Sequence, residues 1–470
     1  MLSLGHYCVK INEEEKALEK GGNDLTVGSP GKVILKFSIP ILLSALLQQF
    51  YSMVDTIVVG QFLGTDALAG VGATGSINFM VIGFCMGICF GFALPMAQYF
   101  GAKDYSTMRK FIYNSIWVSA GFGVIMTIVI CILCRDILIW MSTPDNILEY
   151  AYEYIFIIFA GIPITLAYNL LSGMIRSVGD SQTPFIILLL SAIVNIGVDI
   201  ISVAVLDMGV AGPAYATLLA QLFSVILCLI VIKRKFTFMK IQRDEAKINW
   251  RYIGILCKMG IPMGLQYSIT AIGTIILQVG INSLGSQAVA AVTAAGKISN
   301  FLGCTTDALG STMATYTGQH IGAGKIERIR KGLRAANMMG IIYSVVIFVT
   351  MVLTSKYWLM MFLKPTETQI IADASKWLII NTAFYILLTF VNVFRFTIQG
   401  AGYSGLAIMA GVLEMIARSV VGVWMIPLLG FTGVCIASPV AWIMADSFLI
   451  PMYLKIMKKL ERQQGNTLSV

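Results

Sequence analysis

Charged residues are scarce in this sequence. Only 12% of its 470 residues are Asp, Glu, Lys or Arg, whereas a soluble globular protein has about 25%. Hydrophobic residues make up 57% of the chain, and apolar runs of about 20 residues, long enough to span the core of a bilayer, recur from one end to the other. The composition therefore excludes a soluble protein and predicts an all-α integral membrane protein.

Histidine is scarcer still. His6 and His320 are the only two, which argues against a histidine metal site. The nine Cys lie scattered in apolar segments, where they act as small hydrophobic side chains. No nucleophile–base pair, set of metal ligands or phosphate-binding loop is apparent. We therefore expect neither an enzyme nor a cofactor.

The apolar runs predict twelve membrane spans. They cover residues 33–62, 68–99, 110–134, 148–173, 183–206, 209–232, 252–282, 289–321, 335–355, 371–398, 404–427 and 431–457. Several exceed the minimum length, so we expect tilted spans or helices that extend beyond the bilayer.

The basic residues orient these spans. Lys and Arg are concentrated after the second, sixth and eighth spans and in the C-terminal tail, whereas the loops after the first, fifth, seventh and eleventh spans have none. Short loops rich in Lys and Arg stay in the cytoplasm. We therefore expect a multi-pass protein of the cell's inner (plasma) membrane with both termini cytoplasmic.

The second half of the sequence repeats the first. Gly64-Thr-Asp-Ala-Leu-Ala-Gly resembles Gly285-Ser-Gln-Ala-Val-Ala-Ala, and Gly209-x-x-Gly212 resembles Gly430-x-x-Gly433, both at an offset of 221. Because each half contributes an even number of spans, the halves insert with the same orientation. We expect two pseudo-symmetric six-helix bundles around a central cavity. The predicted parts are a cytoplasmic tail (1–30), an N-terminal lobe (31–232), a basic linker (233–251), a C-terminal lobe (252–457) and a second tail (458–470).

Asp55 is a carboxylate inside the first apolar span. An ionisable group at such a position is expensive to bury and marks a functional site by default. Asp199 and Asn195 share one face of the fifth span, and Thr217 lies near the start of the sixth. Counted from the outer helix ends, Asp55, Asp199 and Thr217 each lie roughly 12–13 Å deep, with Asn195 one turn deeper. The four side chains are therefore expected to meet in the outer half of the N-terminal lobe.

Two carboxylates that converge in a low dielectric cannot both stay charged without compensation. Either one is protonated or a cation lies between them, and oxygen ligands suit Na⁺ as well as a proton. Asp55, Asn195, Asp199 and Thr217 are thus a candidate site for a coupling cation, Na⁺ or H⁺. The alternative is that each aspartate hydrogen-bonds a neighbouring helix and binds nothing. Pro40 interrupts the first span and Pro262 the seventh, so each is a candidate hinge or a static kink.

The second half carries a different set of charges in its spans. A cavity in the C-terminal lobe could be lined by Lys297, Asp307, Arg395, Glu414 and Arg418. Glu414 and Arg418 lie four residues apart, and we interpret them as an intrahelical ion pair. No carboxylate occupies the seventh span, which argues against a second cation site there.

At this point the chain resembles the multidrug and toxic compound extrusion (MATE) family of secondary transporters, and within it the DinF-like bacterial branch. The resemblance covers about residues 30–455 and rests on a set of short motifs. They are Met53-Val-Asp55-Thr-x-x-Val-Gly60, Leu63-Gly64-x-x-Ala67-Leu-Ala69, Gln98-x-x-Gly101-Ala, Arg176-Ser-Val-Gly179-Asp180 and Gly209-Val-x-Gly212-x-Ala-x-Ala-Thr217. The family implies cation-coupled export through two six-helix lobes. It also implies that Asp55, Asn195, Asp199 and Thr217 couple the cation and that the first helix bends at Pro40.

The sequence thus favours an antiporter that works by alternating access. It would export amphipathic compounds, cationic by preference, in exchange for Na⁺ or H⁺, as a monomer whose partners are small molecules and the bilayer rather than nucleic acid. A lipid-linked oligosaccharide flippase of the wider superfamily is the nearest alternative, because it shares the architecture. A membrane-embedded receptor or enzyme is a more distant one.

Overall fold

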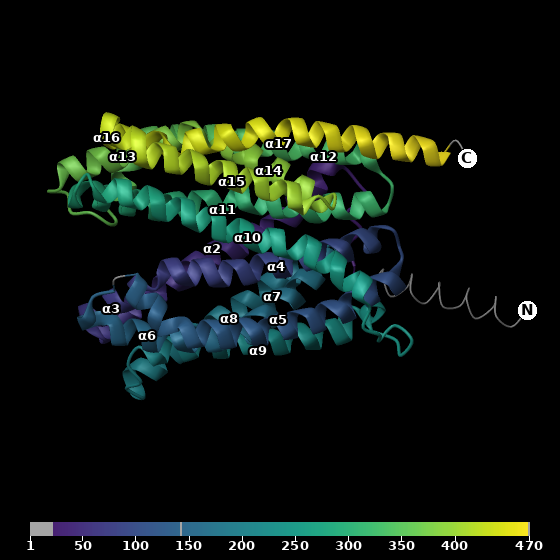
Figure 1. Ribbon diagram of the computed structural model, residues 1–470, viewed down its shortest axis with the longest axis horizontal. Helices are drawn as coiled ribbons and strands as arrows, with labels where there is room; N and C mark the ends of the chain where they lie inside the picture. Colours follow the sequence, from purple (N-terminus) through teal and green to yellow (C-terminus); the bar gives the residue numbers. More distant parts are fainter. Residues whose placement is uncertain (1–21, 142, 469–470) are drawn as a thin grey trace, which may run out of the picture. The chain divides into compact units, whose positions relative to one another are not determined.

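The computed structural model describes residues 22–141 and 143–468, and helices make up most of this part of the chain (Figure 1). No strand occurs among the described residues. The helices are α2 (Pro30–Phe62), α3 (Gly64–Ala73), α4 (Gly75–Gly101), α5 (Tyr105–Trp140), α6 (Asp145–Ala160), α7 (Ile162–Ser177), α8 (Gln182–Ile200), η1 (Ile201–Val205), α9 (Ala211–Lys235), η2 (Thr237–Met239), α10 (Trp250–Asn282), α11 (Ser286–Gly322), α12 (Ile326–Leu359), α13 (Thr368–Ala383), α14 (Tyr385–Gly400), α15 (Ser404–Val420), η3 (Val421–Met425), α16 (Ile426–Leu429) and α17 (Phe431–Leu468).

The predicted all-helical membrane architecture is confirmed. Within the described residues, nine helices are long and apolar enough to cross a membrane, and two bent helix pairs raise the number to eleven. The predicted span outside this count is the eighth, 289–321, which corresponds to α11. This helix is 37 residues long but contains Lys297 and Asp307, and it is not among the helices that are apolar enough to be counted.

Two of the predicted spans are bent. α6 and α7 meet at 49°, and α13 and α14 meet at 50°. The first bend lies at Gly161, followed by Pro163 in the first turn of α7, where proline is tolerated because the N–H groups of that turn have no partner within the helix. The second lies at Phe384.

The two halves of the sequence repeat have matching backbone conformations at corresponding positions. Gly64 and Gly285 have φ of +86° and +92°, and Gly209 and Gly430 both have φ of +57°. Only glycine adopts such values readily. The short π-helices η1 and η3 also occupy corresponding places, directly after α8 and α15. The two halves therefore share their irregularities as well as their helices.

The described chain divides into two compact units. Unit 1 holds residues 22–27, Leu43–Gly264 and Ile321–Ala323, and unit 2 holds Gly28–Leu42, Leu265–His320 and the residues from Gly324 onward. The division runs through α2 two residues after Pro40 and through α10 two residues after Pro262. Residues 1–21 of the predicted N-terminal tail lie outside the described part of the chain.

Glycine allows two helices of unit 1 to pack backbone against backbone. A Cβ added to Gly91 of α4 would lie 2.6 Å from the Cα of Gly260 in α10, and one added to Gly87 would lie 2.5 Å from the carbonyl oxygen of Met263. Such close approach is typical of small residues at helix contacts in membranes. It fixes α10 against α4, and α4 in turn packs on α7.

Asp180 of the Arg176–Asp180 motif joins three elements of unit 1. Its carboxylate accepts hydrogen bonds from the backbone N–H of Thr183 (2.9 Å) and the Thr183 hydroxyl (2.7 Å), which caps α8. It also forms an ion pair with Lys235 at the end of α9 (2.5 Å). Asp180, which is part of one motif of the family resemblance, therefore has a structural role.

Candidate functional site

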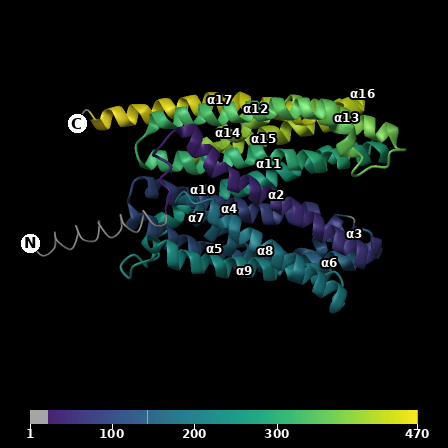
Figure 2. The ribbon, with the colours of Figure 1, turned by 180° about the vertical axis from the view of Figure 1, so that it is seen from behind.

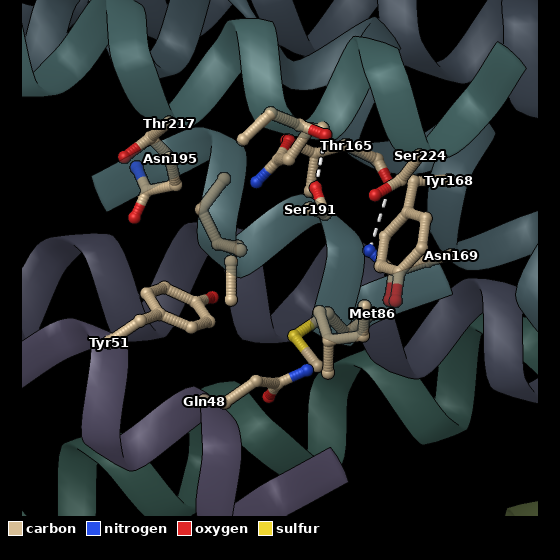
Figure 3. A pocket seen from close by; sticks show the side chains of 15 residues that line it. Gln48, Tyr51, Met86, Thr165, Tyr168, Asn169, Ser191, Asn195, Thr217 and Ser224 are labelled. Carbon is tan, nitrogen blue, oxygen red and sulfur yellow. Dashed lines mark hydrogen bonds between the residues drawn. The ribbon is translucent and has the colours of Figure 1, made fainter. Parts of the chain in front are cut away.

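A cavity of about 130 Å³ lies inside unit 1. α2, α4, α7, α8 and α9 contribute its walls, and Figure 3 shows the side chains that point into it. Asn195 and Thr217 lie together at one end, whereas Tyr168 and Asn169 lie at the other. The structure thus brings two of the four predicted site residues, from different helices, to one cavity.

The two aspartates lie beside this cavity without lining it. Asp199 is one helical turn beyond Asn195 in α8 and is completely buried, and Asp55 of α2 is half-buried. Their carboxyl groups are close enough to interact with one another. All four predicted site residues therefore gather in one region of unit 1, as their estimated depths suggested.

The polar atoms of this cluster have almost no partners. In the described part of the chain, Asp55 Oδ1, both carboxylate oxygens of Asp199 and both side-chain polar atoms of Asn195 are buried without a hydrogen bond. Buried polar atoms are nearly always satisfied in folded proteins, and a buried carboxylate without a partner is costlier still. In this cluster, therefore, no described side chain or backbone group compensates for the burial of these polar atoms.

Three polar side chains around the cluster escaped the sequence analysis. Tyr51 of α2 lines the cavity and lies within electrostatic range of Asp55, and Tyr154 of α6 lies within range of both aspartates. Gln48 lines the cavity one turn before Tyr51. Tyr51 lies four residues and Gln48 seven residues before Asp55, and this helical spacing was the available signal for both, because it puts all three on one face of α2.

The four predicted site residues offer only carboxylate, amide and hydroxyl groups as ligands. Among the described residues, no group of three or more His, Cys, Asp or Glu side chains gathers in a way that could hold a metal ion. Two carboxylates, an amide and a hydroxyl instead suit a proton or a hard monovalent cation.

The charges of unit 2 pair with one another. Glu414 of α15 forms an ion pair with Arg395 of α14 and a longer one with Arg418 (3.6 Å). Asp307 of α11 accepts a hydrogen bond from Asn392 of α14 (2.8 Å). The predicted intrahelical pair is present, but Arg395 is the closer partner of Glu414.

Lys297 lies apart from these pairs. Its side chain is exposed and lines a separate cavity of about 730 Å³ near the start of α11. The five predicted cavity residues of unit 2 therefore do not line one site. Asp446 of α17, which the sequence analysis did not single out, is buried and neither of its carboxylate oxygens has a hydrogen-bond partner among the described residues.

Pro40 lies inside a continuous helix. α2 runs from Pro30 to Phe62 without a break, and α10 likewise continues through Pro262. Each proline lacks the N–H that would bond the carbonyl four residues earlier, so each helix is weakened at this point without being interrupted.

A family model described as MatE matches residues 40–201 and 262–424, which together cover more than half of the chain. The chain belongs to the MatE family. The two matched segments start at Pro40 and Pro262, so the family model recognises both halves of the repeat. This family consists of transporters, as the sequence resemblance implied.

Curated relatives of this MatE protein include two that it matches over most of their length. It is 26% identical to "Probable multidrug resistance protein YoeA" of Bacillus subtilis over 78% of this chain and 80% of that protein. It is 24% identical to "DNA damage-inducible protein F" of Escherichia coli over 79% of this chain and 80% of that protein.

A solved structure has the same fold as this MatE chain. A MATE transporter crystallised in complex with MaL6 superposes with a TM-score of 0.87, at 22% identity, over 93% of this chain and 99% of that one. The likeness extends to nearly the whole of both chains, which confirms the twelve-helix architecture.

Proposed function

We propose that this protein is a secondary antiporter that exports amphipathic compounds, cationic by preference, in exchange for inward movement of H⁺ or Na⁺. One observation carries the proposal: at a cavity in unit 1, the described residues leave one carboxylate oxygen of Asp55, both of Asp199 and the amide of Asn195 buried without a hydrogen-bond partner. Membership of a transporter family and the multidrug resistance named for a relative support it.

In this proposal, Asp55 and Asp199 bind the coupling cation. Binding removes negative charge from the cluster, which weakens the hold on a cationic substrate and favours a different arrangement of α2. The location of the unit boundary just after Pro40 supports bending at that proline. Coupling requires that cation and substrate have different affinities for the two states of the transporter.

The flippase alternative needs a strongly cationic cavity for a pyrophosphate. Arg395 and Arg418 could supply positive charge to such a cavity, but both form ion pairs with Glu414, which reduces that charge. The relatives described above give the flippase alternative no support.

The test is dye efflux from proteoliposomes under an imposed sodium or pH gradient. We expect wild-type protein to export a lipophilic dye cation under at least one gradient, and Asp55→Asn to lose this export because the amide cannot bind a proton or neutralise a cation.

Asp66→Asn is the matched control, because Asp66 is an exposed carboxylate at the start of α3, outside the cluster. It should transport like the wild type. Full gradient-driven export by Asp55→Asn in correctly inserted protein would refute the proposal.

A further inference from the structure

A second cavity of unit 1, of about 590 Å³, lies at the opposite end from the aspartates, where α9 ends and the basic linker begins. Ligand pockets typically measure about 300–1,000 Å³. Its wall is apolar except for three side chains, Lys233, Thr237 and Lys240.

The cavity is a groove with a floor and two sides. α7 packs against both α5 and α9, and the three helices run alongside one another in Figures 1 and 2. Leu171 and Met174 of α7 are buried and form the floor, whereas Ile116 of α5 and Leu229 of α9 are 42% and 51% exposed at the edges.

The two sides of the groove belong to helices that face outward. In its most apolar stretch of 18 residues, α5 has only 11% of the residues buried inside the protein, and α9 has 22%. Outward-facing apolar helices in a membrane protein contact lipid chains. The groove between them is therefore accessible from the bilayer.

The linker closes the end of the groove and is held firmly in place. Phe236 and Met239 are buried and form the closed end. The Arg109 guanidinium of α5 donates two hydrogen bonds to the Glu245 carboxylate (2.7 and 2.8 Å) and one to the Phe238 carbonyl (3.0 Å).

The ion pair with Arg109 persists at neutral pH. Burial alone would raise the pKa of the Glu245 carboxyl, but the hydrogen bonds from Arg109 and from the Gln242 N–H outweigh it and lower that pKa below the usual value. Glu245 therefore stays ionised, and the linker stays docked, at neutral pH.

Two cations remain at the groove without an acidic partner. Lys235, between them in sequence, is paired with Asp180, but Lys233 and Lys240 are exposed and form no ion pair with any residue that the structure describes. By the positive-inside rule they lie at the cytoplasmic surface of the bilayer, where basic pockets between helices bind anionic head groups.

We propose that this groove binds one anionic phospholipid, with an acyl chain lying on α7 between α5 and α9 and its phosphate held by Lys233 and Lys240. The apolar floor and edges of the groove suit a lipid acyl chain, and the two unpaired lysines suit the negative charge of a phosphate. The site is separate from the cation cluster, so it is independent of the proposed transport function.

The experiment counts bound lipid on the full-length protein by native mass spectrometry. The protein in neutral detergent is incubated with equal amounts of phosphatidylglycerol and phosphatidylcholine of the same chain length. We expect preferential retention of one phosphatidylglycerol. Lys233→Gln with Lys240→Gln should weaken it by roughly fivefold per lysine, the factor that corresponds to the attraction of one lysine to an anionic surface.

A matched pair, Arg243→Gln with Lys247→Gln, removes the same charge from exposed positions of the linker that do not line the groove, and should leave retention unchanged. An equal loss in this pair, or equal retention of the two lipids by the wild type, would overturn the proposal.

Two further arms test the acyl chain. Ile116→Trp, which fills the groove without changing the charge, should weaken retention of phosphatidylglycerol, and excess inorganic phosphate should not displace the lipid. Unchanged retention in Ile116→Trp, or displacement by phosphate, would show a simple anion site and contradict the proposal.

Discussion

Asp199 and Glu414 are both buried carboxylates inside membrane-spanning helices, yet their surroundings are opposite. Neither oxygen of Asp199 has a hydrogen-bond partner among the described residues, whereas Glu414 pairs with Arg395 and Arg418. A buried acid without a partner costs free energy, and removal of one member of a buried ion pair leaves the other charge uncompensated. One carboxylate therefore lowers the stability of the fold, and the other supports it.

The two amide substitutions should therefore act in opposite directions. Glu414→Gln removes the ion-pair partner of the buried Arg395 and the half-buried Arg418 and should destabilise the protein by about 3–5 kcal/mol. Asp199→Asn removes a buried acid that has no hydrogen-bond partner among the described residues, so the unfolding temperature should stay equal or rise. Thermal unfolding of the purified proteins measures both. A loss of stability in Asp199→Asn as large as that in Glu414→Gln would contradict this assignment of roles.

The sequence was informative about site residues that are rare in their surroundings. A carboxylate in an apolar helix stands out, so Asp55 and Asp199 could be predicted, and helical spacing then added Asn195. Tyr51 shares a face of α2 with Asp55, so helical spacing could have found it, whereas only the packing of α2 and α6 brings Tyr154 near the aspartates. Asp446 carried the same signal as Asp55 and was overlooked.

At the scale of elements, the crossing of α4 and α10 depends on the absence of side chains. Gly91→Leu would drive a side chain into the backbone at Gly260, and the two helices would have to separate. We expect a large loss of folded protein, measured as the monodisperse fraction in size-exclusion chromatography.

Gly121→Leu is the control for this substitution. Gly121 is a glycine of α5 with no heavy atom within 4 Å of an added Cβ, and leucine has the higher helix propensity. This variant should fold normally. Equal yields of folded protein from Gly91→Leu and Gly121→Leu would show that the close crossing is not needed.

The spans were predictable and their bends were not. Hydropathy gives the length of each apolar run, and the predicted spans correspond to the observed helices or bent pairs. The hydropathy stays high through Gly161 and Phe384, so it does not reveal that the chain bends by about 50° at these two places. Conversely, Pro40 and Pro262 looked like interruptions, but both helices continue through them, because one missing hydrogen bond does not end a long helix packed on its neighbours.

At the scale of the whole molecule, the internal repeat is the feature that the sequence predicted best. The offset of 221 residues, found from short glycine motifs, connects the positive-φ glycines of the two halves. The repeat did not extend to the chemistry, because the aspartate cluster belongs to unit 1 and the arginine–glutamate cluster to unit 2. The halves thus share a scaffold and differ in the charges they bury, which motivates a coupling role for unit 1 alone.

The allocation of α2 to two units was not predictable. The first part of this helix, up to Leu42, belongs to unit 2, and the part that carries Asp55 belongs to unit 1. Hydropathy describes one uninterrupted span, and only the packing of each part shows the division. A single helix thereby joins the cation cluster to the other unit, with Pro40 next to the joint.

If Asp55 and Asp199 bind the coupling cation, that cation and a cationic substrate compete for the protein. Binding of a fluorescent dye cation to the purified protein, titrated over pH at fixed salt and over Na⁺ at fixed pH, measures this competition directly. Affinity for the dye should fall as the coupling cation increases, and Asp55→Asn should abolish that dependence. A wild-type dye affinity that stays the same at every pH and every Na⁺ concentration would contradict cation coupling through Asp55 and Asp199.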